Sequence, residues 1–394
     1  MKFVYIFSIF LIYTVNIFGQ KSDLEYLKDP YNSWADSVLN TMTLDEKIGQ
    51  LLMPRGNYSG QPHDLQKLRE WVKKYKIGGI AFFATHPMTQ AIITNELQAL
   101  SKVPLLIGQD FEWGLGMRLD SSDRIHYNMT LGAITGQDSL LTKIGEEIGK
   151  QCKRMGVHVN YAPVVDVNNN PNNPVINFRS FGSNKTNVAE KGLAIMKGIQ
   201  SQHIICTAKH FPGHGDTDVD SHHDLPVIKH DIDRLRKVEL YPFQVLINNG
   251  LTGVMSAHLS IPALENAKGM ASTFSPNIIT KLLKSEMGFK GLVFTDAMDM
   301  QGAVKNYPKG EAMVRALLAG NDILETFTDV PLAVEAIKNA IQSKIISIEF
   351  LNTKVRKILA AKAWVGLNKY QPIVLDNLIA DLNSYEMDIY NRIT

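Results

Sequence analysis

Eight short apolar segments, each the length of a β-strand, recur along the 394-residue chain and alternate with longer segments of helical periodicity. A strand that is apolar throughout is typical of a parallel sheet covered on both faces by its crossover helices. Eight strand–helix units predict an α/β protein that closes into a single-domain (β/α)8 TIM barrel. The expected strands lie within Leu51–Pro54, Ile77–Phe83, Pro104–Gly108, Val157–Val167, Ile204–Ala208, Thr252–Ala257, Gly291–Thr295 and Asn321–Glu325.

Segments with helical periodicity separate these strands, and two helices have predictable starts. Thr43 and Glu46 have the spacing of a capping box, and Ser347 is the expected N-cap of a last helix over Ser347–Ala363. No Gly-x-Gly-x-x-Gly pattern follows the first strand, which argues against a dinucleotide-binding fold. Further helices are expected over His63–Tyr75, Ser139–Met155, Thr186–Ser201, Asp231–Asn249, Ser275–Met287, Gly310–Leu318 and Pro331–Ser343.

The two ends of the chain differ in character from the barrel. Residues 3–18 are almost all apolar and follow a basic start. This pattern predicts a secretory signal peptide over residues 1–19, because the apolar run is shorter than the ~20 residues of a spanning helix. A retained membrane anchor is the alternative. We expect the barrel over residues 20–365 and a C-terminal tail or linker over residues 366–394. The protein would then be periplasmic or secreted, without membrane association once the signal is removed.

Composition excludes other classes of function. The formal net charge is +2 without long basic runs, so the chain lacks the electrostatic signature of a nucleic-acid-binding protein. Cys152 and Cys206 form neither a metal-ligand spacing nor a disulfide framework. We therefore expect two buried thiols, to which the sequence assigns no role, and a disulfide between them is the alternative. We also expect a monomeric protein that uses no cofactor and no metal.

The densest group of polar residues follows the fifth expected strand, over Lys209–Pro226. It holds four histidines, four aspartates and a lysine at the end of a barrel strand, where active sites of this fold lie. Asp220 and His222 are two residues apart, so a turn can bring the carboxylate to one imidazole nitrogen. The other nitrogen is then free to transfer protons. The alternative, a polar surface loop, explains a single histidine better than this cluster.

Three further polar positions lie where expected strands end or in the loops that follow. Asp296 ends the seventh strand, where its carboxylate could attack an electrophilic carbon or could instead cap a helix. Asp110 ends the third strand, and its two oxygens could hold sugar hydroxyl groups. Arg179 offers a planar guanidinium in the long loop after the fourth strand. Taken singly, Asp110 and Arg179 are more readily explained as structural residues.

The loop Lys209–Asp224 resembles the Lys-His-Phe-Pro-Gly-His-Gly…Asp-Ser-His motif of glycoside hydrolase family 3, in its β-N-acetylglucosaminidase branch. The resemblance extends from about residue 38 to 366 and includes Pro174–Gly182 and Gly291–Met300. It implies one catalytic barrel domain with Asp296 as nucleophile and an Asp220–His222 acid/base dyad. The implied sugar contacts are Asp110, Arg118, Arg179, Lys209 and His210.

One segment departs from the family pattern. The usual Asp-Gln-Glu-Gly-Gly-Arg-Val is replaced by Asp110-Phe111-Glu112-Trp113-Gly114-Leu115-Gly116, so Arg118 stands further along the chain than the family's arginine. The assignment of Arg118 is accordingly the least direct of the set.

The resemblance implies an exported, retaining exo-β-N-acetylglucosaminidase acting on peptidoglycan fragments or chitooligosaccharides through a covalent glycosyl-aspartate. A β-glycoside phosphorylase or another family 3 β-glycosidase remains an alternative. A metal-dependent hydrolase with His210, His214 and His222 as ligands is disfavoured, because no His-Glu-x-x-His helix is present. An inactive carbohydrate-binding barrel is disfavoured because every chemical role has a candidate residue.

Overall fold

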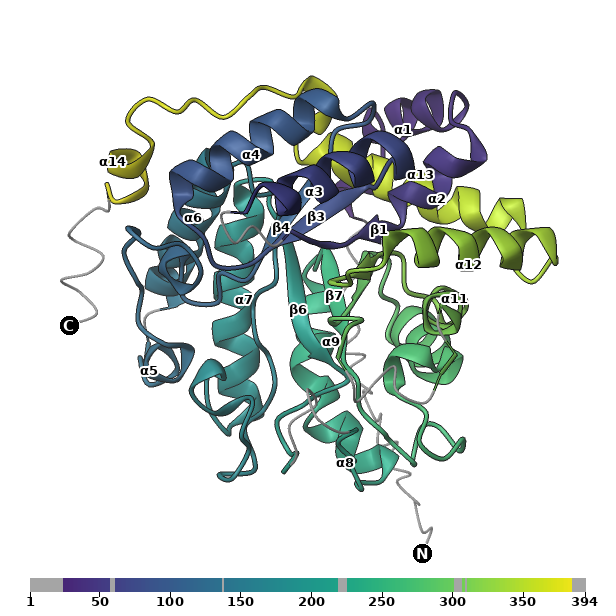
Figure 1. Ribbon diagram of the computed structural model, residues 1–394. Helices are drawn as coiled ribbons and strands as arrows, with labels where there is room; N and C mark the ends of the chain where they lie inside the picture. The colour runs from purple at the N-terminus through teal and green to yellow at the C-terminus, as the bar shows by residue number, and fades with distance from the viewer. Residues whose placement is uncertain are drawn as a thin grey trace, which may run out of the picture.

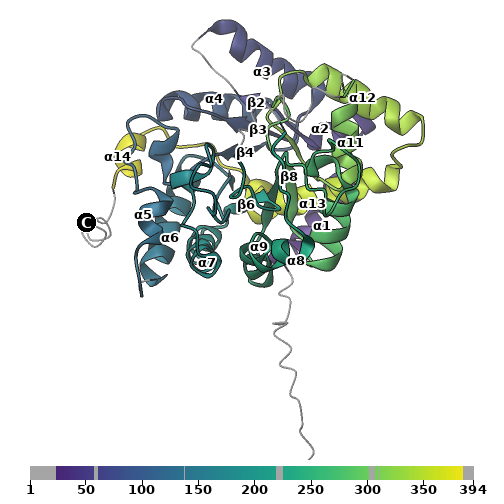
Figure 2. The same ribbon diagram turned by 90° about the horizontal axis from the view of Figure 1, so that it is seen from below.

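The strands form a closed parallel barrel (Figures 1 and 2). In the computed structural model, seven strands pair side by side in chain order from β2 to β8, and β1 pairs with β9. Only Pro54 separates β1 from β2, and a bridge between Phe294 and Ile323 joins β8 to the segment that leads into β9. The ring is therefore complete, and the predicted (β/α)8 fold is confirmed. The structure describes residues 24–56, 61–136, 138–218, 225–300, 307–308 and 310–384.

Each expected apolar segment overlaps a barrel strand, and strand burial explains the agreement. Every strand residue except Arg55 is buried, as expected for a sheet enclosed by helices. The strands are β1 (Leu52–Met53), β2 (Arg55–Gly56), β3 (Gly79–Phe82), β4 (Leu106–Gln109), β5 (Val159–Asn160), β6 (Ile205–Phe211), β7 (Gly253–Ser256), β8 (Leu292–Thr295) and β9 (Leu324–Glu325).

Helices surround the barrel, and both predicted caps are present. The Thr43 hydroxyl accepts a hydrogen bond from the Glu46 amide while the Glu46 carboxylate accepts one from the Thr43 amide, and Ser347 Oγ accepts from the Phe350 amide. The helices are α1 (Tyr31–Leu39), α2 (Leu44–Gln50), α3 (Pro62–Tyr75), α4 (Pro87–Leu100), α5 (Asn128–Gly132), α6 (Asp138–Arg154), α7 (Lys185–Ser201), α8 (Ile232–Lys237), α9 (Leu240–Asn248), η5 (Asn277–Glu286), α11 (Glu311–Ala319), α12 (Val330–Gln342), α13 (Ile348–Trp364) and α14 (Leu378–Leu382). Shorter helical turns are η1 (Glu25–Leu27), η2 (Leu115–Met117), η3 (Asn177–Arg179), η4 (Ser272–Phe274) and η6 (Leu367–Lys369).

One expected helix is divided in two. The segment Asp231–Asn249 forms α8 and α9, with the break at Val238 and Glu239. Pro242 explains the break, because a proline has no N–H to donate within a continuous helix and its ring would clash with the preceding turn. In the first turn of α9 the missing N–H costs nothing, since no helical acceptor is available there.

The C-terminal segment that the structure describes packs against the barrel. Helix α14 contacts α4 and α6, and the backbone of Ile373 is held by both the amide and carbonyl groups of the Asn95 side chain. Residues 365–374 line a hollow with Gly156, Val157 and Ile204, which precede β5 and β6. The segment therefore covers the N-terminal ends of these strands, the end opposite to the one where barrel active sites lie.

Two further expectations can be compared with the structure. Cys152 and Cys206 are both buried free thiols, as expected. Among the described residues, no helix has the length and apolar character needed to cross a bilayer. The expected signal peptide, residues 1–19, lies outside the described residues.

Candidate active site

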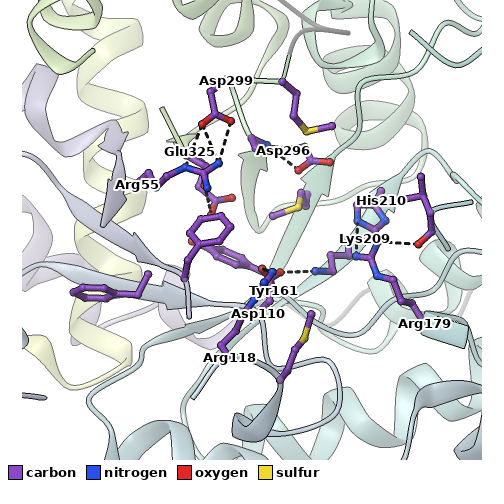
Figure 3. Close-up of a pocket in the computed structure, with 18 of the residues that line it drawn as sticks. Arg55, Asp110, Arg118, Tyr161, Arg179, Lys209, His210, Asp296, Asp299 and Glu325 are labelled. Atoms are coloured by element: carbon purple, nitrogen blue, oxygen red, sulfur yellow. Dashed lines mark hydrogen bonds and ion pairs between the residues drawn. The ribbon is translucent and has the colours of Figure 1, made fainter. Parts of the chain in front are cut away.

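A cavity of about 210 Å³ opens at the C-terminal ends of the barrel strands (Figure 3). Every strand position of the ring contributes a residue to its lining, so side chains far apart in sequence converge on one space. The polar lining residues are Arg55, Asp110, Arg118, Tyr161, Arg179, Lys209, His210, His214, Asp296, Asp299, Glu325 and Thr326.

Lys209, near the end of β6, connects the two carboxylates on one side of the cavity. Its Nζ lies 2.7 Å from Asp110 and 2.8 Å from Glu112, and only 2% of its side chain is exposed. Arg118 also pairs with Asp110, while Arg179 makes a two-point contact with Glu112 at 2.7 and 3.0 Å. Two carboxylates and three cations thus form one buried network that fixes each head group in place.

The charges in this network decide the protonation of its carboxyl groups. Burial alone would raise the pKa of Asp110, but Lys209 and Arg118 hold it well below its usual range. Burial likewise opposes ionisation of Glu112, yet Arg179 and Lys209 lower its pKa to about 2. Burial would lower the pKa of Lys209, and the two carboxylates raise it instead. All three groups are therefore charged at neutral pH, and two of them, Asp110 and Lys209, line the cavity.

His210 is held in a fixed orientation by Asp166, which is fully buried. Its Nδ1 lies 2.7 Å from Asp166 Oδ2, and its Nε2 lies 3.3 Å from Arg179 Nη2. Both partners are satisfied when Nδ1 donates to Asp166 and Nε2 accepts from Arg179. Asp166 also accepts the backbone amides of His210 and His214. Burial would raise the pKa of Asp166, but the two histidines, His210 above all, lower it. The ring that faces the cavity is consequently fixed from behind.

His214 has a structural position beside this pair. Its Nδ1 lies 2.8 Å from Thr217 Oγ1, and its ring is 5.9 Å from that of His210, centroid to centroid. Burial, with the neighbouring His210 ring, lowers the pKa of His214 to about 4. The contacts with Asp166 and Thr217 hold the start of the loop after β6 in place.

Asp296 follows the last residue of β8 and lines the cavity. Its amide donates to Ser256 O at 2.9 Å, which extends the β7–β8 pairing, and its Oδ1 accepts the Ala297 amide at 2.7 Å. Burial would raise the pKa of this carboxyl, but the neighbouring His210 and His258 lower it. Asp296 is thus an ionised carboxylate at the mouth of the barrel, as a nucleophile requires.

The opposite side of the cavity holds groups that the sequence interpretation missed. Arg55 pairs with Asp299 at 2.9 Å and lies over the Phe83 ring, 4.0 Å from its centroid. Glu325, the last residue of β9, is 2% exposed, and burial together with the charges of Asp110 and Asp296 raises its pKa well above its usual value. Its position at a strand end is a signal in the sequence that could have identified it.

The structure brings together most of the predicted site residues. Six of the eight line this one cavity: Asp110, Arg118, Arg179, Lys209, His210 and Asp296. The predicted dyad, Asp220 and His222, lies outside the described residues.

One group of residues in the described part of the chain has the spacing of a metal site. Ligand atoms of Asp216, His230 and Glu239 lie within 4.8 Å of one another. The Glu239 carboxylate is engaged by Arg234 through both oxygens, and His230 Nε2 lies 2.5 Å from Asp216 Oδ2. These side chains already satisfy one another, so the cluster has a structural explanation.

A sequence profile described as the glycosyl hydrolase family 3 N-terminal domain matches residues 43–361. The chain belongs to glycoside hydrolase family 3. The predicted family is therefore confirmed, and the matched region contains the whole barrel from the capping box at Thr43 to the last turn of α13.

Named relatives of this family 3 chain carry hexosaminidase descriptions. It is 40% identical to beta-hexosaminidase A of Pseudoalteromonas piscicida over 279 residues, which are 65% of this chain and 47% of that protein. It is 29% identical to a beta-N-acetylglucosaminidase/beta-glucosidase of Cellulomonas fimi over 351 residues, 87% of this chain and 61% of that protein. The chain thus spans about half to three-fifths of the length of these two relatives.

Solved structures show the same fold. A family 3 beta-N-acetylglucosaminidase from Paenibacillus sp. str. FPU-7 has a TM-score of 0.79 and 34% identity, and the match covers 87% of this chain and 68% of that one. A beta-glucoside phosphorylase has a TM-score of 0.87 at 24% identity, covering 95% and 68%. At that identity the second likeness supports the fold alone.

Proposed function

We propose that this chain is a retaining exo-β-N-acetylglucosaminidase that removes terminal β-linked N-acetylglucosamine. The observation that carries the proposal is the presence of the ionised Asp296 in one small cavity with the Lys209–Asp110–Glu112 network. A cavity of about 210 Å³ is smaller than those that enclose drug-sized ligands, which suits a single sugar ring. The named relatives support the choice of N-acetylglucosamine over glucose.

In the proposed mechanism the two sides of the cavity have different tasks. Asp110, Lys209, Arg118, Arg179 and His210 bind the hydroxyl groups of the terminal sugar. Their charged, preorganised head groups need no rearrangement when the ring enters. A cavity of this small volume, lined by such a network, suits a terminal sugar better than one inside a glycan chain.

Asp296 then attacks the anomeric carbon, and the bond to the leaving oxygen breaks. His222 of the Asp220–His222 dyad protonates that oxygen. A water molecule gives its proton to His222 and attacks the glycosyl-aspartate, which releases the sugar with its anomeric configuration retained and Asp296 ionised again. The roles of Asp220 and His222 rest on the sequence motif.

We also propose that the protein is exported to the periplasm or beyond, because of the apolar segment at residues 3–18. Peptidoglycan fragments and chitooligosaccharides are then the proposed substrates. No cofactor or metal has a role in this mechanism.

The test compares aryl β-N-acetylglucosaminide and aryl β-glucoside hydrolysis by the wild type and three variants. Asp296→Ala removes the nucleophile and is expected to abolish measurable turnover. His222→Ala is expected to lower kcat at least about 100-fold for a substrate with a poor leaving group, the range for loss of general acid–base catalysis. His223→Ala is the matched control, since this adjacent histidine has no role in the mechanism.

Full activity in Asp296→Ala or His222→Ala would sink the assignment. Products measured with and without inorganic phosphate identify the acceptor. A sugar 1-phosphate as the main product would replace the hydrolase with a phosphorylase.

A further inference from the structure

Glu325 is a buried carboxyl group that lines the cavity without an ion-pair partner among the described residues (Figure 3). Its Oε1 accepts a hydrogen bond from Thr326 Oγ1 at 3.2 Å. Its Oε2 is buried and has no hydrogen-bond partner in the described part of the chain. An unsatisfied buried polar atom is costly to a folded protein, so one that lines a cavity points to a ligand that completes its hydrogen bonds.

The cations nearest to the cavity are committed to other carboxylates. Lys209 is held by Asp110 and Glu112, and Arg55 is held by Asp299. Glu325 therefore lies among ionised carboxylates, and no cation of the described residues is paired with it.

Arg118 shows the same pattern on the other side of the cavity. Its Nη2 pairs with Asp110, but its buried Nε has no hydrogen-bond partner among the described residues. Among the buried polar side-chain atoms that lack a partner, these two, Arg118 Nε and Glu325 Oε2, belong to described residues that line the cavity. Arg118 is an expected sugar contact, which would give its Nε a hydrogen-bond partner. A sugar in the same cavity would give Glu325 Oε2 a partner as well.

We propose that Glu325 is a substrate-positioning residue whose carboxyl group binds a hydroxyl group of the sugar in this cavity. The proposal rests on the proposed function in that the ligand is taken to be a sugar. Its backbone already serves the barrel, since the Glu325 amide donates to Thr295 Oγ1 and its carbonyl accepts the Met298 amide. These strand contacts need no particular side chain, which leaves the carboxyl group itself to be explained.

The surroundings of Glu325 favour its neutral form. Burial raises its pKa most, and the charges of Asp110 after β4 and Asp296 after β8 raise it further. The neighbouring Tyr161 hydroxyl, which follows β5, and the charge of Lys209 on β6 act in the opposite direction and do not compensate. A neutral carboxyl group donates through its O–H and accepts through its C=O, so it can give and receive hydrogen bonds with sugar hydroxyl groups.

The experiment measures kcat, KM and the affinity for free N-acetylglucosamine by calorimetry in wild type, Glu325→Gln and Glu325→Leu. Glutamine keeps a donor and an acceptor of the same shape, and leucine keeps the volume alone. Glu46→Gln is the matched control, because Glu46 is a mostly buried carboxylate in the capping box of α2, outside the cavity lining. Melting temperatures show whether each variant is folded.

We expect Glu325→Gln to keep KM and sugar affinity within about threefold of wild type, and Glu325→Leu to weaken both by roughly tenfold with a smaller change in kcat. A series of deoxy substrates, each lacking one hydroxyl group, identifies the contact. For the substrate that lacks the hydroxyl group bound by Glu325, Glu325→Leu and wild type should have the same KM. Wild-type KM should rise at alkaline pH as Glu325 ionises beside Asp296, and Glu325→Gln should lack this rise.

A folded Glu325→Leu with wild-type KM and affinity overturns the proposal while leaving the proposed function intact. An equal loss for all deoxy substrates also overturns it. If the wild type binds free sugar through Glu325 but hydrolyses no glycoside, the proposed function is contradicted and the Glu325–sugar contact stands. A wild type that neither binds nor cleaves any sugar overturns both.

Discussion

Single carboxyl groups in the cavity differ in protonation because they differ in access to a cation. Glu112 and Glu325 are both buried glutamates within the same barrel mouth, yet their pKa values move in opposite directions. Arg179 and Lys209 compensate the burial of Glu112, whereas Asp110 and Asp296 add to the effect of burial on Glu325. Charge placement thus assigns different tasks to identical side chains.

Replacing Lys209 with methionine tests this dependence. Lys209→Met leaves Asp110 and Glu112 buried with one cation each, so we expect the free energy of unfolding at pH 7 to fall by about 3 kcal/mol. Lys197→Met, at an exposed position, should change it by less than about 0.5 kcal/mol. Chemical denaturation measures both, and equal effects would show that the Lys209 network does not stabilise the fold.

The sequence identified the residues of one side of the cavity and missed those of the other. Lys209 and His210 stand together in a loop rich in polar residues, and that density is visible in the chain itself. Arg55 begins β2 and Glu325 ends β9, and neither stands in a segment as rich in polar residues as that loop. Only closure of the barrel brings them to Asp296, and the sequence alone does not show what surrounds them.

Among the helices, the packing of α6 on α7 depends on glycines that let two backbones approach. A Cβ built on Gly198 would lie 2.1 Å from the carbonyl oxygen of Thr142. Gly198 is in α7, whereas Gly149 is in α6, and a Cβ on Gly149 would first meet side-chain atoms of Gln202 at 2.8 and 2.9 Å, a less severe contact than one with the backbone at 2.1 Å. An added methyl group at Gly198 would therefore disturb the packing of α6 on α7 more than one at Gly149.

Alanine substitutions at these glycines give the matched test. Gly198→Ala should lower the free energy of unfolding by roughly 1–3 kcal/mol, because the backbone clash exceeds the gain in helix propensity. Gly149→Ala should change it much less. Thermal unfolding of both variants is the measurement, and a stabilised Gly198→Ala would contradict this packing.

Element prediction succeeded where a single physical cause governs the pattern. The strands are apolar because helices cover the outer face of the barrel and its interior buries the inner face, so all eight were found. Helix α4 was not singled out, because Gln90, Thr94 and Gln98 are buried on it and interrupt its apolar stripe. Gln90 bonds to the Gln109 side chain and Gln98 to the Leu105 backbone, partners that only the folded barrel supplies.

Over the whole molecule, the catalytic end and the C-terminal segment lie at opposite ends of the barrel. The cavity is built from the C-terminal strand ends, and residues 365–374 lie against the segments that precede β5 and β6. The sequence offered no strand or motif beyond residue 366, so this arrangement could not be predicted. Ile373, Leu378 and Leu382 are nonetheless buried there.

Deletion of residues 370–394 should therefore separate stability from activity. We expect the melting temperature to fall by roughly 5 °C or more, since three buried apolar side chains and the Arg154–Asp381 ion pair are lost. KM for an aryl glycoside should stay unchanged. A large rise in KM in a folded truncation would show that the two ends of the barrel are coupled.

The account depends most on Asp296 forming a bond to the sugar within this cavity. Incubation with an activated fluoro-sugar that slows release of the glycosyl-enzyme, followed by peptide mass spectrometry, tests it directly. We predict one sugar per chain, attached to the peptide that contains Asp296, and no label on Asp296→Ala. An active enzyme that carries the label on a different residue would contradict the account.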